Sequence, residues 1–169
     1  MKKLHSLMLA AHKGGFALWK LNFVLSFGIP FNRPHRIKIA SLSSDSATCV
    51  VPYRRSNHNH IRGTHACALA TCAEFSTGLL LLQYLNPASY RIIMKTMTME
   101  YHYQAKADVR SVFHMTQQEF EERVLKPLQE NETVDLACVA HLSDTEGNRI
   151  ATGTTVWQIK PWSRVKTQV

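Results

Sequence analysis

Residues 65–83 read HACALATCAEFSTGLLLLQ and form the most apolar part of this 169-residue chain. Glu74 is the only Asp, Glu, Lys or Arg between Gly63 and Tyr90. Because burying an unpaired charge is costly, a carboxylate on such a helix must be paired, protonated or placed for chemistry. A polar seam on the same helix offers the alternative that Glu74 points out to solvent. The seam consists of Thr71, Ser76 and Thr77.

The composition is that of one globular domain, with 45% hydrophobic and 19% charged residues. The four cysteines form no C-x-x-C pair and have apolar neighbours, so we expect reduced thiols in a cytoplasmic protein.

The N-terminus does not read as an export signal, because His5, His12 and the Gly14-Gly15 pair interrupt the segment after the initial Met-Lys-Lys. The run Leu79–Leu82 is too short to cross a bilayer.

The net charge of +8 and pI near 9.5 permit a nucleic acid, an acidic membrane surface or a polyanionic small ligand as partner. The basic residues are spread along the chain, apart from the pair Arg54-Arg55. No helix-turn-helix, zinc-finger or ribonucleoprotein motif is present. We therefore do not expect nucleic acid or a membrane as a partner, and a phosphate-bearing ligand accounts for the charge at least as well. The N-terminal helix could cap the ligand pocket, extend a dimer interface or touch a membrane surface.

Alternating apolar and polar residues predict strands in three consecutive pairs, each pair joined as a hairpin. The first helix is expected over Leu4–Phe27, with a break at Gly14-Gly15. Thr116 to Glu119 is a capping box that opens a short helix, and Gly147 supplies a positive φ in the last hairpin turn. The six predicted strands cover residues 36–42, 47–54, 91–103, 106–115, 133–142 and 149–160.

This element order predicts an α+β protein in which one antiparallel sheet curls around one long central helix. A helix that is apolar nearly all round must be wrapped rather than laid on a surface. A sheet joined by hairpins is antiparallel. Both demands are met by the hotdog fold, with residues 1–27 as an N-terminal helical segment and residues 28–169 as a single hotdog domain.

From about Phe27 onward, the chain resembles the hotdog-fold acyl-CoA thioesterases, specifically the phenylacetate-pathway-like group and its uncharacterised bacterial relatives. The resemblance is carried by residues 59–74, NHIRGTHACALATCAE, in which an Asn precedes a His that is followed by a small pair. An acidic residue comes nine positions after that His. Pro30-Phe31, Arg54-Arg55 and the acidic hairpin at Gly147 also look like the bacterial relatives.

The resemblance implies hydrolysis of an acyl- or aryl-CoA, with no cofactor beyond the coenzyme A of the substrate. The backbone N–H at Ala66 would bind the thioester carbonyl. Glu74 would act as general base or nucleophile, and Asn59 would orient the water or the carboxylate. Ala66 and Cys67 depart from the small Gly pair of the family and add bulk where the acyl group approaches.

Three arginines are candidates for the coenzyme A phosphates, with ordinary solvated charge as the alternative for each. They are Arg54, Arg55 and Arg62. Methionines and tyrosines at strand spacing could line an adaptable acyl pocket or be plain core. They are Met94, Met97, Met99, Tyr84, Tyr101 and Tyr103.

His65 and Glu74 lie nine residues apart, which at ~100° per residue places them on roughly opposite faces of one helix. The two side chains can hardly meet within one subunit. We therefore expect a site assembled across a homodimer, alone or within a dimer of dimers (a homotetramer), as the resemblance also implies.

His58, His60 and His65 could ligate a metal, but the chain lacks the Asp or Cys partners of the usual zinc hydrolase patterns, so no metal is predicted. No G-x-S-x-G, Walker A or G-x-G-x-x-G motif occurs. The alternative to an enzyme is a non-catalytic hotdog protein that binds acyl-CoA or fatty acyl ligands as a sensor or carrier.

Overall fold

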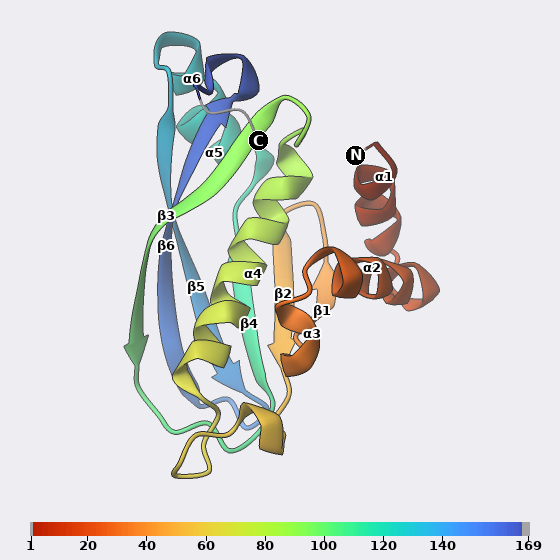
Figure 1. Cartoon of the computed structure of the whole chain (residues 1–169), viewed down its shortest axis with the longest axis vertical. Helices are drawn as coiled ribbons and strands as arrows, with labels where there is room; N and C mark the ends of the chain where they lie inside the picture. Colours follow the sequence, from red (N-terminus) through yellow and green to blue (C-terminus); the bar gives the residue numbers. More distant parts are fainter. Residues whose placement is uncertain (1, 167–169) are drawn as a thin grey trace.

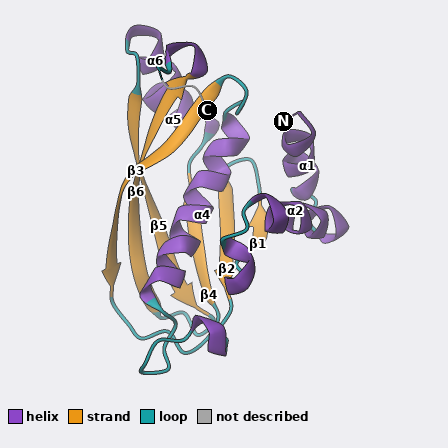
Figure 2. Ribbon diagram, viewed as in Figure 1, coloured by secondary structure: helices purple, strands orange, loops and turns teal. Residues whose placement is uncertain are grey.

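A six-stranded antiparallel sheet curves around one long helix, α4 (Ala66–Tyr84), in the computed structural model, which describes residues 2–166 (Figures 1 and 2). The strand order is β1-β2-β4-β5-β6-β3. This is the α+β hotdog fold that the sequence predicts. The strands are β1 (Lys38–Leu42), β2 (Ser46–Val51), β3 (Tyr90–Tyr101), β4 (Val109–His114), β5 (Val134–Asp144) and β6 (Arg149–Pro161).

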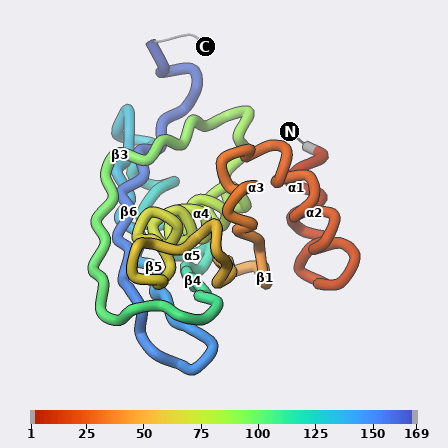
Figure 3. The backbone as a smooth tube through the Cα atoms, turned by 60° about the horizontal axis from the view of Figure 1, so that its bottom comes forward, coloured from red at the N-terminus to blue at the C-terminus, as the bar shows by residue number. Residues whose placement is uncertain are grey.

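Two N-terminal helices pack beside β1 and α4, on the side of α4 away from β3 (Figures 1 and 3). They are α1 (Lys2–Ala11) and α2 (Gly15–Gly28), and their break at Gly14 and Gly15, both at positive φ, confirms the prediction. Met8, Ala11 and Leu21 are buried in the same core as the sheet. The remaining short helices are α3 (Asn32–His35), η1 (Arg55–Asn57), α5 (Gln117–Phe120), η2 (Glu121–Leu125), α6 (Pro127–Glu130) and η3 (Trp162–Arg164).

The two turn signals read from the sequence are confirmed. Thr116 Oγ1 accepts the N–H of Glu119, and the Glu119 carboxylate accepts the N–H of Thr116, which together form the capping box of α5. Gly147 has φ +87 in the turn between β5 and β6.

The predicted pairing of the third and fourth strands is wrong. β3 pairs with β6, whereas β4 lies between β2 and β5. The segment between β3 and β4 crosses from one part of the sheet to another instead of forming a hairpin turn. Alternation of side chains fixes that a segment is a strand and which face is buried, but it carries no information about the partner.

The polar seam of α4 faces the sheet, so it offers Glu74 no path to solvent. Ser76 and Thr77 are fully buried, and Thr71 is nearly so. Each hydroxyl donates to a carbonyl of its own helix. Ser76 also bonds Ser111 at 2.8 Å, and Thr77 Oγ1 accepts from Thr155 and from Trp157 Nε1, both at 3.1 Å. Burying a hydroxyl costs little free energy when it is hydrogen-bonded in this way.

By length and composition, α4 is the one helix of the described residues that could cross a membrane, but 67% of its most apolar window is buried. It is therefore the core helix of the domain.

The close approach of α4 to the sheet requires a glycine opposite Ala73. A Cβ added to Gly153 would lie 2.8 Å from Ala73 Cβ and 2.9 Å from Met99 Sδ.

We expect Gly153→Ala to lower the free energy of unfolding by about 1–3 kcal/mol, because the methyl group overpacks the contact between α4 and β6. Gly28→Ala is the matched control, since a Cβ at Gly28 meets nothing within 4 Å. Chemical denaturation of both variants measures the effect. Equal stability of the two variants would contradict the tight packing at Gly153.

Candidate active site

The first turn of α4 leaves one backbone amide without a partner. His65 is the N-cap: its Nδ1 accepts the N–H of Cys67 at 3.1 Å, and its carbonyl accepts from Ala68 and Leu69. Within residues 2–166, the N–H of Ala66 has no hydrogen-bond partner, and Ala66 is exposed. This amide stands at the positive end of the helix dipole, where it can bind a developing negative charge.

Asn57 holds the loop before α4 in place. Its side chain is 1% exposed, bonds His35 Nδ1 and donates to the carbonyls of His35 and Pro52. Its own carbonyl accepts the N–H of His65 at 2.7 Å. Asn57 therefore ties α3, the end of β2 and the start of α4 together. The sequence did not reveal this role, since nothing in its neighbours distinguishes Asn57 from Asn59.

Asn59 shapes the turn that leads into α4. Its Oδ1 accepts the N–H of Ile61 at 3.1 Å and of Gly63 at 2.9 Å, and its backbone pairs with Gly63 and Arg62. Arg62 has φ +60, the left-handed conformation that closes the turn. Asn59 Oδ1 is thus occupied by the backbone, whereas its Nδ2 has no protein partner among the described residues.

Two buried polar atoms beside the start of α4 lack a partner among the described residues. They are His58 Nε2 and Thr64 Oγ1, which lie on two residues that face each other across an isolated bridge. Thr64 is 5% exposed and directly precedes the N-cap. Because an unsatisfied buried polar atom costs about 1–3 kcal/mol, this pair marks a place for a water molecule or a polar ligand group. Sequence reasoning missed Thr64.

Glu74 is half-buried on the open stripe of α4, with no ion pair or side-chain hydrogen bond among residues 2–166. Cys67, Ala70 and Gly78 are the other exposed or half-buried residues of this stripe, at helical spacing. Burial raises the pKa of the Glu74 carboxyl above its ordinary value of 4.5. Glu74 is therefore neither paired nor carried outward on a polar face.

The structure does not bring Glu74 to the first turn of its own helix. From Ala66 to Glu74, the uninterrupted α4 rises by ~12 Å along its axis. No hydrogen bond joins His65 to Glu74 in the described chain. A site that uses both ends of this stripe needs either a ligand that spans them or a second copy of the helix.

The inner face of β3 lies against this part of α4. The hydroxyl of Tyr101 donates to the carbonyl of Ala66 at 3.2 Å, and Met99 Sδ lies beside the contact between Gly153 and Ala73. Met94 and Met97 are half-buried against the core. Tyr84 lies elsewhere: its hydroxyl donates to Ser44 and Met115 at the far end of α4.

The three candidate arginines lie in the segment between β2 and α4. Arg54 is half-buried, whereas Arg55 and Arg62 are exposed. None of them forms a salt bridge within residues 2–166. The described residues bring no three His, Cys, Asp or Glu side chains close enough to hold a metal ion, so His58, His60 and His65 are not gathered into one cluster.

Several solved structures are similar to this chain. A Pseudomonas aeruginosa protein of unknown function, described as a probable thioesterase, is 23% identical with a TM-score of 0.76, over 83% of this chain and 93% of its own. A Chlorobaculum tepidum protein of unknown function is 14% identical with a TM-score of 0.71, over 83% and 92%. A mutant Pseudomonas aeruginosa thioesterase is 15% identical with a TM-score of 0.65, over 85% and 94%.

These likenesses show that the fold is the one used by thioesterases of the hotdog type. A comparison with curated proteins finds none that matches. The family model DUF4442, described as a domain of unknown function, matches residues 18–159, and the chain therefore belongs to the DUF4442 family.

Proposed function

We propose that this protein hydrolyses acyl-CoA thioesters, with Glu74 as the general base. The proposal rests on two groups of α4. The Glu74 carboxylate is half-buried on the open stripe and has no partner within residues 2–166, and the Ala66 N–H at the start of the same helix has none either. A free carboxylate in an apolar setting and a free helix-start amide are the two groups that thioester hydrolysis requires.

In the proposed reaction, Glu74 removes a proton from a water molecule as its oxygen attacks the thioester carbonyl carbon. The Ala66 N–H donates to the carbonyl oxygen as it becomes negatively charged. The tetrahedral intermediate then collapses, and the C–S bond breaks. Coenzyme A leaves as a thiolate, and it takes up the proton that Glu74 accepted. The products are a carboxylic acid and coenzyme A.

The carboxylate and the amide come from two subunits in this proposal. β3 is an edge strand of twelve residues that pairs only with β6 in the described chain. Its exposed residues include Ile93 and Tyr101. An edge strand with free backbone groups is a template for pairing with another strand. A second copy that pairs its own β3 about a twofold axis would present the start of its α4 to Glu74.

Coenzyme A carries phosphates, and the start of α4 is bordered by cations. Arg54, Arg55 and Arg62 all belong to the segment that ends at the N-cap, and none has an acidic partner among residues 2–166. Guanidinium groups bind phosphate oxygens in a bidentate manner. We assign these arginines to the phosphate end of the substrate.

One observation favours the second candidate, an acyl-CoA-binding protein without turnover. Ala66 and Cys67 are exposed side chains at the point where the thioester would approach the free amide. Their bulk restricts that approach. A panel of short, aryl and long acyl-CoA thioesters tests this alternative. If they bind but none is cleaved, the protein belongs to this second class.

We expect Glu74→Gln to lower kcat/KM for an acyl-CoA thioester by at least about a hundredfold, because the amide cannot accept a proton. Coenzyme A affinity should be retained. A thiol-release assay and calorimetry measure the two quantities, with the exposed Glu130→Gln as the control. Hydrolysis by Glu74→Gln at the wild-type rate would remove Glu74 from the mechanism.

The pH dependence follows from the raised pKa of Glu74. The base must be ionised, so kcat/KM should rise with pH through a midpoint above the ordinary 4.5. The free energy of unfolding should change with pH in the opposite direction to kcat/KM. A carboxyl whose pKa is raised on folding favours the folded state at low pH, and this contribution is lost as the pH rises through the folded pKa. Glu74→Gln should therefore be at least as stable as the wild type at neutral pH. Thermal melts of the wild type and of Glu74→Gln from acidic to neutral pH test the direction of this change in stability.

Cys67 should be the one thiol that iodoacetamide modifies quickly, because the other cysteines are buried. Burial also raises the pKa of Cys72 and of Cys138 to about 12, which keeps them as unreactive thiols. A non-hydrolysable acyl-CoA analogue should slow the labelling of Cys67. Mass spectrometry locates the label, and Cys67→Ser is the control. Labelling that a saturating analogue leaves unchanged would place the ligand elsewhere.

A further inference from the structure

The helix α2 carries a row of exposed aromatic rings on the side that faces away from the core. The row consists of Phe16, Trp19, Phe23 and Phe27, which are 76%, 58%, 53% and 57% exposed. Neighbouring ring centroids lie 5.4, 5.6 and 5.1 Å apart. The opposite side of α2 is apolar too, with Leu21 fully buried and Leu18 and Leu25 packed on the core. A helix that is apolar on both sides is expected to be covered on both sides.

The segment that carries this row holds only basic charges, although Asp108 from another part of the chain lines a groove with Trp19, Lys38 and Arg110. Residues 1–44 contain seven Lys or Arg and no Asp or Glu, whereas residues 45–169 contain the other thirteen basic residues and all twelve acidic ones. Nearly the whole net charge of +8 therefore belongs to the segment that carries the aromatic row. The cations are spread along the whole chain, whereas the acids begin only at Asp45.

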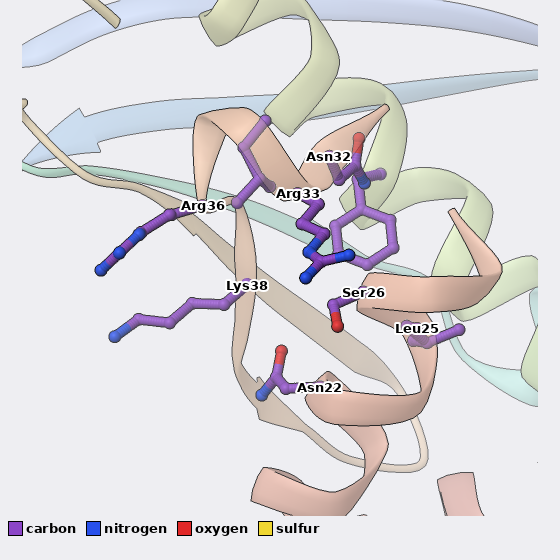
Figure 4. A pocket seen from close by; sticks show the side chains of 9 residues that line it. Asn22, Leu25, Ser26, Asn32, Arg33, Arg36 and Lys38 are labelled. Carbon is purple, nitrogen blue, oxygen red and sulfur yellow. The ribbon is translucent and has the colours of Figure 1, made fainter. Parts of the chain in front are cut away.

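Cations border the aromatic row on both flanks. On one flank, Lys3 and Lys20 line a shallow groove between α1 and α2. On the other, Arg33, Arg36 and Lys38 border a cavity of about 280 Å³ beneath α2. Figure 4 shows that Arg33 points into this cavity, whereas Arg36 and Lys38 extend to the same outer side. No salt bridge within residues 2–166 neutralises any of these cations.

We propose that the aromatic row of α2 and its flanking cations form a docking surface for a membrane with anionic lipid headgroups. Rings of Phe and Trp favour the boundary between headgroups and acyl chains. Each Lys or Arg near an anionic bilayer adds about 1 kcal/mol of attraction. Arg33 lies 4.8 Å above the Phe27 ring, so charge and aromatic surface meet at one place. From the sequence, a membrane contact was only one of three open roles for the N-terminal helix, because the exposure of the rings is visible only in the structure.

A second copy of this chain fits the surface poorly. A twofold contact through α2 would bring together two copies of residues 1–44, which contain seven Lys or Arg and no acid, and one acid from elsewhere, Asp108, lies beside Trp19. The unpaired apolar edge strand β3 lies on the other side of α4 (Figures 1 and 3). Self-association through β3 would therefore leave the aromatic row open. The proposal does not depend on the thioesterase activity.

The test uses the full chain with vesicles of phosphatidylcholine alone and of equal parts phosphatidylcholine and phosphatidylglycerol. We expect co-sedimentation and a blue shift of tryptophan emission with the mixed vesicles only. Trp19 is the most exposed of the tryptophans, since Trp157 is buried and Trp162 is 39% exposed. Trp19→Phe should keep the binding and lose the blue shift. Absence of binding to the mixed vesicles overturns the proposal.

Two double variants separate the aromatic and ionic contributions. Trp19→Ser with Phe23→Ser should weaken vesicle binding at least about tenfold, whereas Val112→Ser with Val139→Ser, on the exposed face of the sheet, should not. Lys20→Gln with Arg33→Gln should weaken binding about fivefold for each cation removed; the exposed pair Lys106→Gln with Lys126→Gln is the control.

Three further outcomes would overturn the proposal. One is vesicle binding that the aromatic double variant leaves unchanged while its thermal melt shows a folded protein. Another is a change in oligomer mass in that variant by light scattering, which would mean that another copy of the chain covers the row. Binding of an oligonucleotide in preference to the mixed vesicles would also exclude a membrane as the partner.

Discussion

The burial of α4 against the concave face of the sheet is the contact on which the rest of the structure depends. The helix can approach so closely because Gly153 has no side chain opposite Ala73 and because Ser76 and Thr77 find partners inside. These bonds fix the rotation of the helix about its axis. The same rotation leaves the stripe with Glu74 open. The position of the carboxylate is thus a consequence of how the opposite side of the helix is satisfied.

The central helix and its wrapped environment could be predicted from the sequence, because a long apolar segment has only one stable place in a domain of this size. The local signals that depend on a few neighbours, such as the capping box at Thr116 and the turn at Gly147, were equally accessible. Strand pairing was not: β3 and β4 are consecutive in sequence and lie far apart in the sheet order. Nothing in their alternation distinguishes a hairpin turn from a crossover.

In the candidate site, too, some features could be predicted from the sequence and others could not. Glu74 and the small pair at the helix start stand out in the sequence by composition and spacing. Asn57, by contrast, gained its role from contacts with His35 and Pro52, which are distant in sequence or unremarkable in type. The seam of Thr71, Ser76 and Thr77 offered an alternative path to solvent in the sequence, whereas in the structure Ser76 and Thr77 bond side chains of the sheet. A hydroxyl on a helix is compatible with either side, because it can return its hydrogen bond to its own backbone.

Two apolar surfaces of this molecule lack a partner in the described chain, and the charges around them differ. The edge strand β3 carries charges of both signs, Glu100 and Lys95, and Lys95 is paired with Asp135. Mixed charge of this kind is compatible with a second copy of the same surface. Around the row on α2 cations outnumber acids, since Lys3, Lys20, Arg33, Arg36, Lys38 and Arg110 lie near it and Asp108 lines a groove with Trp19. This excess disfavours self-pairing and favours an anionic surface. Because the two surfaces lie on opposite sides of α4, a dimer formed through one leaves the other free. A dimer would then present two such rows, and the two weak membrane contacts would reinforce each other wherever both can reach the same surface.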